Sequence, residues 1–223
     1  MNENKQKLII VGTGPQAQIA RDYFVEYSNF DVVGFACHSK FKDSDDTYGM
    51  PLIAIEDLLE KHSPDGTAAF VAIGYKNMNK MRQSVYEEIK SLGFRLASFI
   101  HPRATISATA EFGDNVFVFE ENTIQPYVKI GNNTVLWSGN HIGHHSSIGN
   151  HCFISSHVVV SGSCKIGNNV FVGVNATFHD SLEIADECLI GAGTLITKST
   201  KPKEVFLASK TKPFPKDSEA LGF

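Results

Sequence analysis

Residues 142–171 read IGHHSS, IGNHCF, ISSHVV, VSGSCK and IGNNVF when they are cut every six residues. The same register runs from residue 100 to residue 201, and all 17 first positions in it are Ile, Leu, Val or Phe. Glycine fills the second position seven times, and small side chains dominate the fifth. A sustained six-residue period predicts a parallel β-helix with three short strands in each 18-residue coil.

Such a helix stacks its coils about 4.8 Å apart, which is the spacing of hydrogen-bonded strands. We therefore expect the first-position side chains to form an apolar column inside the helix. The glycines are expected at tight corners, where their backbone freedom is useful. Cys152 and Cys188 share the fifth position two coils apart, so they should stack inside one face.

Residues 1–99 have a different pattern, in which short apolar runs alternate with helical periodicity. Strands are expected at 7–11, 31–36, 68–73 and 96–100, with helices at 17–27, 55–62 and 80–92. This alternation predicts a small parallel, Rossmann-like α/β sheet. The predicted organisation is an α/β domain at 1–99, a β-helix at 100–201 and a C-terminal tail at 202–223.

Composition excludes several classes of protein. The chain has 223 residues, a formal net charge of −4 and a pI near 6.1, without the basic stripe of a nucleic-acid binder. No apolar run approaches the roughly 20 residues of a membrane span, and the polar start does not resemble a signal peptide. We therefore expect a cytoplasmic protein that binds neither nucleic acid nor membrane. The four cysteines form no C-x-x-C pair and are expected as buried thiols: Cys37, Cys152, Cys164 and Cys188.

A glycine-rich loop follows the first predicted strand. The run Gly12-Thr13-Gly14-Pro15-Gln16 begins like the dinucleotide fingerprint G-x-G-x-x-G, but Ala17 stands in place of its last glycine. A helix that starts after glycine offers backbone N–H groups to a diphosphate. The loop is therefore either a phosphate-binding element or only a turn between a strand and a helix.

Three passages in this order carry a resemblance: Ile-Ile-Val-Gly-Thr-Gly at 9–14, Ala-Ile-Gly-Tyr-Lys-Asn at 72–77, and Phe-Ile-His-Pro at 99–102 leading into the hexads. Together they resemble the bacterial hexapeptide-repeat sugar acetyltransferases of the bacillosamine N-acetyltransferase and sialic acid O-acetyltransferase type. The resemblance covers about residues 7–212. It implies a left-handed β-helix, a homotrimer, acetyl-CoA in a groove between neighbouring β-helices, and a nucleotide-linked sugar bound by the α/β domain.

The resemblance also implies a reaction and its residues. The expected reaction is acetylation of the amino group of a nucleotide-linked amino-deoxy sugar for surface glycan synthesis, such as that of lipopolysaccharide or O-antigen. The amine attacks the thioester directly, with no metal. The implied catalytic residues are His144, as general base, and His145. Acetyl-CoA would contact Gly162, Gly173 and Val174. The nucleotide sugar would contact Gly12, Gly14, Pro15, Gln16 and Gly74.

The chemistry of histidine supports this role independently, because an imidazole with a pKa near 6.5 suits proton removal from an amine near neutral pH. Three positions depart from the family pattern. His145 replaces an acidic residue after the base, Trp137 replaces an asparagine, and Phe153 replaces a histidine. His141 and His145 therefore remain alternative bases.

Other functions stay open at this point. The first is sialic acid-type O-acetylation. The second is a zinc hydratase on the same β-helix, although His145, His151 and His157 are six residues apart and should lie at three different corners. The third is a non-catalytic scaffold or sugar-nucleotide sensor.

Overall fold

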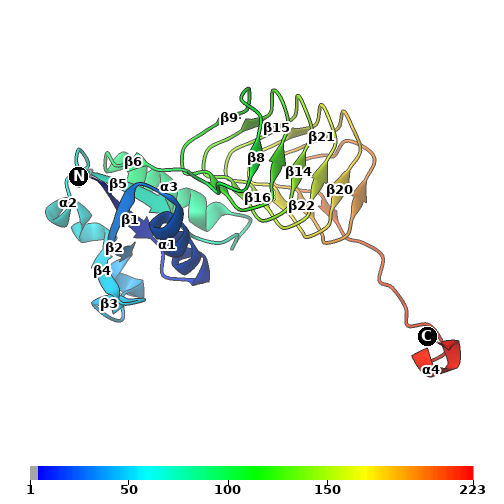
Figure 1. Ribbon diagram of the computed structural model, residues 1–223, viewed down its shortest axis with the longest axis horizontal. Helices are drawn as coiled ribbons and strands as arrows, with labels where there is room; N and C mark the ends of the chain where they lie inside the picture. The colour runs from blue at the N-terminus through cyan, green and yellow to red at the C-terminus, as the bar shows by residue number, and fades with distance from the viewer. Residues whose placement is uncertain (1–4, 223) are drawn as a thin grey trace.

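The computed structural model describes residues 5–222; residues 1–4 and 223, at the outer ends of the predicted first and third segments, lie outside it. An α/β sheet stands at one end, a parallel β-helix extends away from it, and a C-terminal segment leaves the last coil (Figure 1). The predicted fold class, an α/β region followed by a left-handed parallel β-helix, is confirmed. The structure contains no helix in residues 5–222 long and apolar enough to span a bilayer.

The α/β part is a six-stranded sheet in the order β3-β4-β2-β1-β5-β6, parallel except for the β3–β4 pair. Its strands are β1 Gln6–Val11, β2 Phe30–Cys37, β3 Asp46–Thr47, β4 Met50–Ala54, β5 Thr67–Val71 and β6 Arg95–Leu96. Its helices are α1 Pro15–Tyr27, α2 Leu58–Lys61 and α3 Lys80–Ser91, with 3₁₀ turns η1 Ser39–Phe41 and η2 Ile55–Asp57. The central strands β1 and β5 are apolar almost throughout because both faces of the sheet are covered.

Two sequence predictions need correction here. The single strand expected at 96–100 is divided between two sheets. Leu96 pairs with β5, whereas Phe99 in β7 (Phe99–Ile100) pairs with the β-helix, because the backbone changes hydrogen-bond partner between Ala97 and Phe99. The helix expected at 55–62 is only η2 followed by the four-residue α2, and the β3–β4 hairpin adds a pair of strands that the sequence pattern does not predict.

The β-helix has three faces, each a parallel sheet. The first, which we call the docked face, contains β7, β10 Phe117–Val118, β13 Val135–Leu136, β16 Phe153–Ile154, β19 Phe171–Val172, β22 Leu189–Ile190 and β24 Val205–Phe206. The second, the neutral face, contains β8 Thr105–Ile106, β11 Thr123–Ile124, β14 His141–Ile142, β17 Val159–Val160, β20 Thr177–Phe178 and β23 Leu195–Ile196. The third, the charged face, contains β9 Glu111–Phe112, β12 Lys129–Ile130, β15 Ser147–Ile148, β18 Lys165–Ile166 and β21 Glu183–Ile184. A short helix, α4 Ser218–Leu221, lies in the C-terminal segment.

The first-position side chains form the interior, as predicted. They are the second residues of the strands, and those from Val118 to Ile196 are almost completely buried in one apolar cluster. The three cysteines of the β-helix occupy fifth positions and are wholly buried in the same cluster, while Cys37 is buried in the α/β part. All four are free thiols, which confirms that prediction.

The corners of the β-helix differ from the prediction. The hexad position that needs a left-handed backbone is not the second, where most of the glycines of the β-helix lie. In the hexads whose fourth positions run from Asn115 to Glu187, the left-handed conformation falls on that fourth position, where non-glycine residues have φ between 52° and 62°. The second-position glycines have ordinary φ values and are required for another reason. A Cβ at Gly143 would lie 2.6 Å from the backbone nitrogen of Gly162, and one at Gly149 would lie 2.6 Å from the oxygen of Gly167. The close approach of successive coils therefore explains these glycines.

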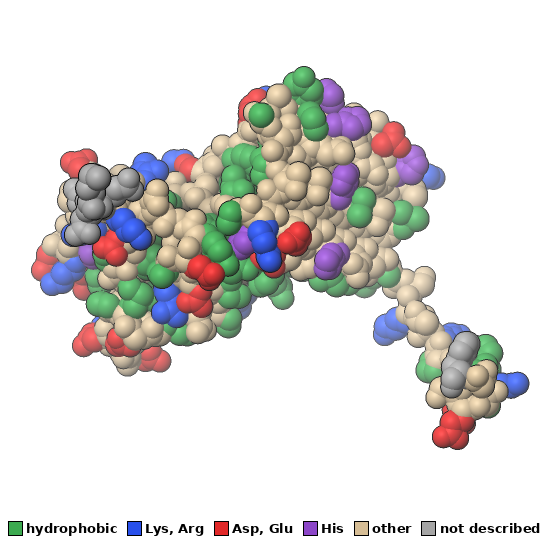
Figure 2. Space-filling model, viewed as in Figure 1, with side chains coloured by type: hydrophobic (Ala, Val, Ile, Leu, Met, Phe, Trp, Pro, Cys, Tyr) green, Lys and Arg blue, Asp and Glu red, His purple; other side chains and the backbone are tan. Residues whose placement is uncertain are grey.

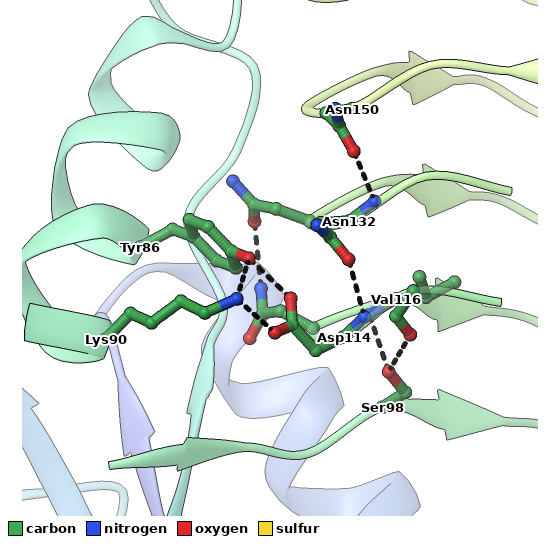
Figure 3. A network of polar contacts seen from close by, with 10 residues as sticks. Tyr86, Lys90, Ser98, Asp114, Val116, Asn132 and Asn150 are labelled. Carbon is green, nitrogen blue, oxygen red and sulfur yellow. Dashed lines mark hydrogen bonds and ion pairs between the residues drawn. The ribbon is translucent and has the colours of Figure 1, made fainter. Parts of the chain in front are cut away.

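Helix α3 attaches the α/β part to the corner between the charged and docked faces. One turn of an α-helix rises about 5.4 Å, close to the coil spacing of about 4.8 Å, so successive turns of α3 meet successive coils. The contacts join Lys80 to Glu187, Gln83 to Asn169, Arg82 to the carbonyls of Asn133 and His151, and Lys90 and Tyr86 to Asp114. Figure 3 shows Tyr86 and Lys90 reaching Asp114 beside a column of asparagines.

Candidate functional site

A cavity of the α/β part lies where β1 and β5 end, beside the first turns of α1 and α3. Its volume is about 900 Å³. The structure brings together here all five residues predicted to contact a nucleotide sugar: Gly12, Gly14, Pro15, Gln16 and Gly74. The edge of a parallel sheet beyond the carboxyl ends of its strands is the general position of ligand sites in α/β folds.

The cavity is electropositive in composition. Its lining includes Lys40, Lys76, Lys80 and His38, and no Asp or Glu. Two of these side chains contact acidic residues outside the lining: His38 Nε2 lies 2.8 Å from Glu88, and Lys80 Nζ lies 2.6 Å from Glu187. A cavity with this lining suits an anionic ligand.

Gln16 lines the cavity and has a buried side-chain amide without a partner among the described residues. Its side chain is only 9% exposed, and its Nε2 has no hydrogen-bond partner within residues 5–222. Buried amide groups are almost always paired in folded proteins. An unpaired amide at the start of α1, in the lining of a cavity, is therefore suited to a hydrogen-bond acceptor on a bound molecule.

His144 lies far from this cavity in the fold. It stands between β14 and β15, at the corner where the neutral face meets the charged face, and its side chain is exposed. The α/β part packs against the docked face, which is the opposite side of the triangular helix. Histidine side chains are visible at the surface of the β-helix in Figure 2.

Two neighbours define the position of the His144 ring. Its Nδ1 lies 3.1 Å from Nδ1 of His145, and its backbone N–H donates to Gln125 Oε1 at 2.9 Å. The His145 ring packs on Tyr127, with ring centroids 4.8 Å apart. On the next coil, Gly162 leaves room for the His144 ring, because a Cβ there would lie 2.8 Å from both Cε1 and Nε2.

The residues predicted to contact acetyl-CoA do not lie together. Gly162 is next to His144, but Gly173 and Val174 follow β19 and lie at the corner between the docked and neutral faces. The two groups thus flank the neutral face on opposite edges. His141, an alternative base, lies on the neutral face itself and is half-buried.

The family-pattern departures at Trp137 and Phe153 are packing residues in this structure. Trp137 stacks on Phe119 with centroids 4.4 Å apart. Phe153 is 4% exposed and lies beneath Tyr75, whose ring centroid is 4.9 Å away. Both therefore belong to the contact between the β-helix and the α/β part.

Some residues near these sites were not singled out from the sequence. Lys40 and Lys76 line the cavity, and the only signal for Lys76 was its place in the Gly-Tyr-Lys-Asn run after a strand. Arg82 carried no signal, because an arginine on an amphipathic helix usually faces solvent. The predicted positions of His145, His151 and His157 at three different corners are confirmed. No group of three or more His, Cys, Asp or Glu side chains within residues 5–222 is arranged to hold a metal ion.

The hexad repeats match a known protein family model. Residues 127–162 and 163–198 match the family model described as bacterial transferase hexapeptide (six repeats). No curated protein sequence is significantly similar to the chain.

Solved structures match nearly the whole chain. The acetyltransferase domain of PglB from Neisseria gonorrhoeae is 22% identical, with a TM-score of 0.81 over 94% of this chain and 100% of that one. PerB from Caulobacter crescentus, solved with CoA and GDP-perosamine, is also 22% identical, with a TM-score of 0.81 over 91% of this chain and 94% of that one. WeeI from Acinetobacter baumannii is 16% identical, with a TM-score of 0.79 over 90% and 96% of the two chains. Residues 127–198 of this chain therefore match the bacterial transferase hexapeptide repeat, and the chain shares with these three proteins the fold of an α/β sheet followed by a left-handed β-helix.

Proposed function

We propose that the protein is an acetyl-CoA-dependent acetyltransferase acting on the amino group of a nucleotide-linked amino-deoxy sugar. The observation that carries the proposal is a cavity without carboxylates, lined by Lys40, Lys76 and Lys80, in the α/β part of a chain whose β-helix presents an exposed histidine pair. The likeness to PerB, which was solved with CoA and GDP-perosamine, supports both substrates.

In this proposal the cavity holds the nucleotide diphosphate. At the start of α1, Pro15 has no N–H, and the N–H groups of Ala17 and Gln18 donate to the Gly14 carbonyl. The backbone N–H of Gln16 is therefore the donor that remains for an anion, where the helix dipole is positive. The buried amide of Gln16 and the ammonium of Lys76 supply further donors. The sugar extends from the cavity toward the acetyl donor.

His144 is the proposed general base. Its Nε2 accepts the proton lost by the sugar amine as the nitrogen forms a bond to the thioester carbonyl carbon. The carbon–sulfur bond then breaks, and the departing CoA thiolate takes the proton from the imidazolium and leaves as the free thiol. The Nδ1–Nδ1 distance of 3.1 Å to His145 requires one of the two nitrogens to carry hydrogen and the other to accept it. We assign Nδ1–H to His144, which leaves its Nε2 free as the base and lets His145 stabilise the imidazolium that forms.

The reaction needs more than one chain, because the cavity and His144 lie on opposite sides of the β-helix in a single chain. We propose a homotrimer in which the cavity of one protomer meets His144 of its neighbour. The outward side chains of the neutral face support this assembly, since they carry no carboxylate, lysine or arginine: Thr105, Thr123, His141, Val159, Thr177 and Leu195. The charged face instead carries Lys129–Glu111 and Lys165–Glu183 ion pairs suited to solvent.

Within such a trimer, Gly162 and the pair Gly173–Val174 flank the neutral face on opposite edges. Contact of acetyl-CoA with both groups therefore requires two protomers, which agrees with a groove between neighbouring β-helices. We propose that the reaction takes place in the cytoplasm, where it would supply an N-acetylated nucleotide sugar for surface glycan synthesis.

The test is turnover of acetyl-CoA with a panel of UDP-, dTDP- and GDP-linked amino sugars, followed by detection of the free CoA thiol. We expect one or more acceptors to react, and His144→Ala to lower kcat about 10²- to 10⁴-fold. An amide product resists hydroxylamine, whereas an O-acetyl ester is cleaved by it, so the product also decides between N- and O-acetylation. Absence of turnover with every acceptor, or an unchanged rate in His144→Ala, would refute the assignment.

A further inference from the structure

Arg82 is a wholly buried cation without an acidic partner. Its side chain has 0% exposure, and no Asp or Glu within residues 5–222 forms an ion pair with it. Burial lowers the pKa of Arg82 to about 10, which still leaves the guanidinium charged at neutral pH. A buried charge is costly unless hydrogen bonds satisfy it. The hydrogen bonds of the Arg82 guanidinium must therefore offset the free-energy cost of burying its charge.

The guanidinium joins two parts of the molecule. On one side, Nη1 donates to the Gly74 carbonyl at 3.1 Å, to that of Ile73 at 3.5 Å and to Asn79 Oδ1 at 3.2 Å. On the other side, the acceptors are β-helix carbonyls: Asn133 at 3.3 Å, His151 at 3.0 Å and Cys152 at 3.0 Å. Ile73 and Gly74 line the cavity, so Arg82 connects the cavity wall directly to the β-helix.

The segment that follows Gly74 has an unusual backbone. Asn77, Met78 and Asn79 have φ values of 54°, 49° and 65°, which make one left-handed turn. Left-handed helical geometry costs roughly 1–2 kcal/mol per residue for side chains other than glycine. Such a turn persists only where its surroundings fix it, and strained segments of this kind gather at functional sites.

Two further contacts fix the turn. The buried Asn79 donates from Nδ2 to the Val170 carbonyl at 3.3 Å. Tyr75 packs on Phe153 and Phe171, and Phe153 also lies under the guanidinium, with Cζ 5.8 Å from its ring centroid. An aromatic ring at 153 thus supports both the arginine and the turn.

We infer that Arg82 is a positioning residue that holds the left-handed turn at 75–79 against the β-helix and thereby sets the cavity wall formed by Ile73, Gly74, Lys76 and Asn77. This inference rests on the proposed function in assigning a nucleoside diphosphate to that cavity. The planar guanidinium reaches acceptors on both sides at once, whereas a lysine ammonium has three donors and no fork. Arg82→Lys should therefore keep the charge but release one side.

The first measurement needs no ligand. Hydrogen exchange followed by mass spectrometry on the full chain should show amides at 74–79 exchanging about tenfold faster in Arg82→Lys, with regions away from this contact little changed. Lys90→Met is the matched control, because Lys90 also joins α3 to the β-helix, at Asp114, but does not line the cavity. Asn79→Gly is a second test variant, since glycine suits the left-handed backbone and removes only the side-chain contacts. Unchanged exchange at 74–79 in both test variants, or the same increase in Lys90→Met, would overturn the inference.

The second measurement is calorimetric titration with UDP, dTDP and GDP. The diphosphate that binds the wild type should bind Arg82→Lys about tenfold more weakly, while the affinity for CoA stays within about twofold. A looser turn with unchanged diphosphate affinity would refute the positioning role. If no diphosphate binds the wild type, the assignment of the cavity fails, and the exchange experiment still decides whether Arg82 holds the turn.

Discussion

Gly162 offers a sharp test of where the base lies, because its missing side chain is the space that the His144 ring occupies. A Cβ built on Gly162 lies 2.8 Å from Cε1 and Nε2 of His144 and 3.3 Å from Nδ1. The backbone of Gly162 has no left-handed φ, so alanine fits the main chain without strain. In Gly162→Ala the exposed ring must move by roughly 1 Å to restore an ordinary van der Waals contact, or rotate away.

The expected effect is on catalysis and not on stability. A displacement of about 1 Å at a reacting group costs on the order of 10²-fold in rate. Because the clash is with the mobile end of an exposed side chain, the free energy of unfolding should change by less than about 0.5 kcal/mol. We therefore expect kcat to fall about 100-fold with the melting temperature nearly constant; because Gly162 is also a proposed acetyl-CoA contact, the KM for acetyl-CoA is expected to rise in addition.

Gly149→Ala is the matched control with the opposite result. Its Cβ would lie 2.6 Å from the oxygen and 2.7 Å from the carbon of Gly167, both backbone atoms that cannot rotate away. Overpacking of this kind costs about 1–3 kcal/mol, which corresponds to a fall of roughly 2–12 °C in Tm for a chain of this size. Steady-state kinetics and thermal unfolding of both variants provide the assay. Full kcat in Gly162→Ala, or a loss confined to the KM for acetyl-CoA, would refute the placement of the base.

Three further predictions concern pH, the asparagine column and the cavity. Burial, and then the charge of Arg82, lower the pKa of His151 below its unfolded value of about 6.5. The folded state therefore binds fewer protons than the unfolded state, and the free energy of unfolding should fall as pH drops below 6.5. His151→Asn, which suits the left-handed position, should reduce that loss in Tm measurements between pH 7 and pH 5; an unchanged slope would contradict it. Asn150→Ala should lower the free energy of unfolding by about 1–2 kcal/mol, measured with denaturant, because it leaves the Asn132 N–H unpaired. Asn150→Asp keeps the acceptor and should cost less. Equal losses in the two variants would argue against a stabilising asparagine column. Lys76→Gln should weaken nucleoside diphosphate binding several-fold and reduce its dependence on salt, and identical salt slopes in a titration would count against a cationic cavity.

The hexad register predicted the β-helix correctly, because each first-position side chain packs against the same position in the neighbouring coils and so recurs at a fixed spacing in the sequence. The buried column from Val118 to Ile196 follows directly from the first-position residues. The corner chemistry was less accessible. The second-position glycines allow the next coil to approach without a clash, and the sequence alone does not distinguish this from a requirement for positive φ.

The candidate site was predictable only in parts. The loop from Gly12 to Gln16 and the run at 72–77 carry local signals, and the structure brings them to one cavity. Arg82 was missed because its acceptors in the β-helix are backbone carbonyls of residues 51 to 70 positions away, which leave no pattern in the sequence. The separation of the cavity from His144 was also missed, because it depends on which face of the β-helix the α/β part covers.

That separation leads to the central claim, that one active site combines the cavity of one protomer with His144 of another. Gly14→Trp is suited to block the cavity, because Gly14 has φ of −82° and a Cβ added to it would meet no atom within 4 Å. Gly14→Trp and His144→Ala chains should each be inactive alone. Co-refolded in equal amounts, they should recover about a quarter of the wild-type rate, since a site needs an intact cavity from one chain and an intact histidine from another. Mixed assemblies that remain inactive would contradict the account.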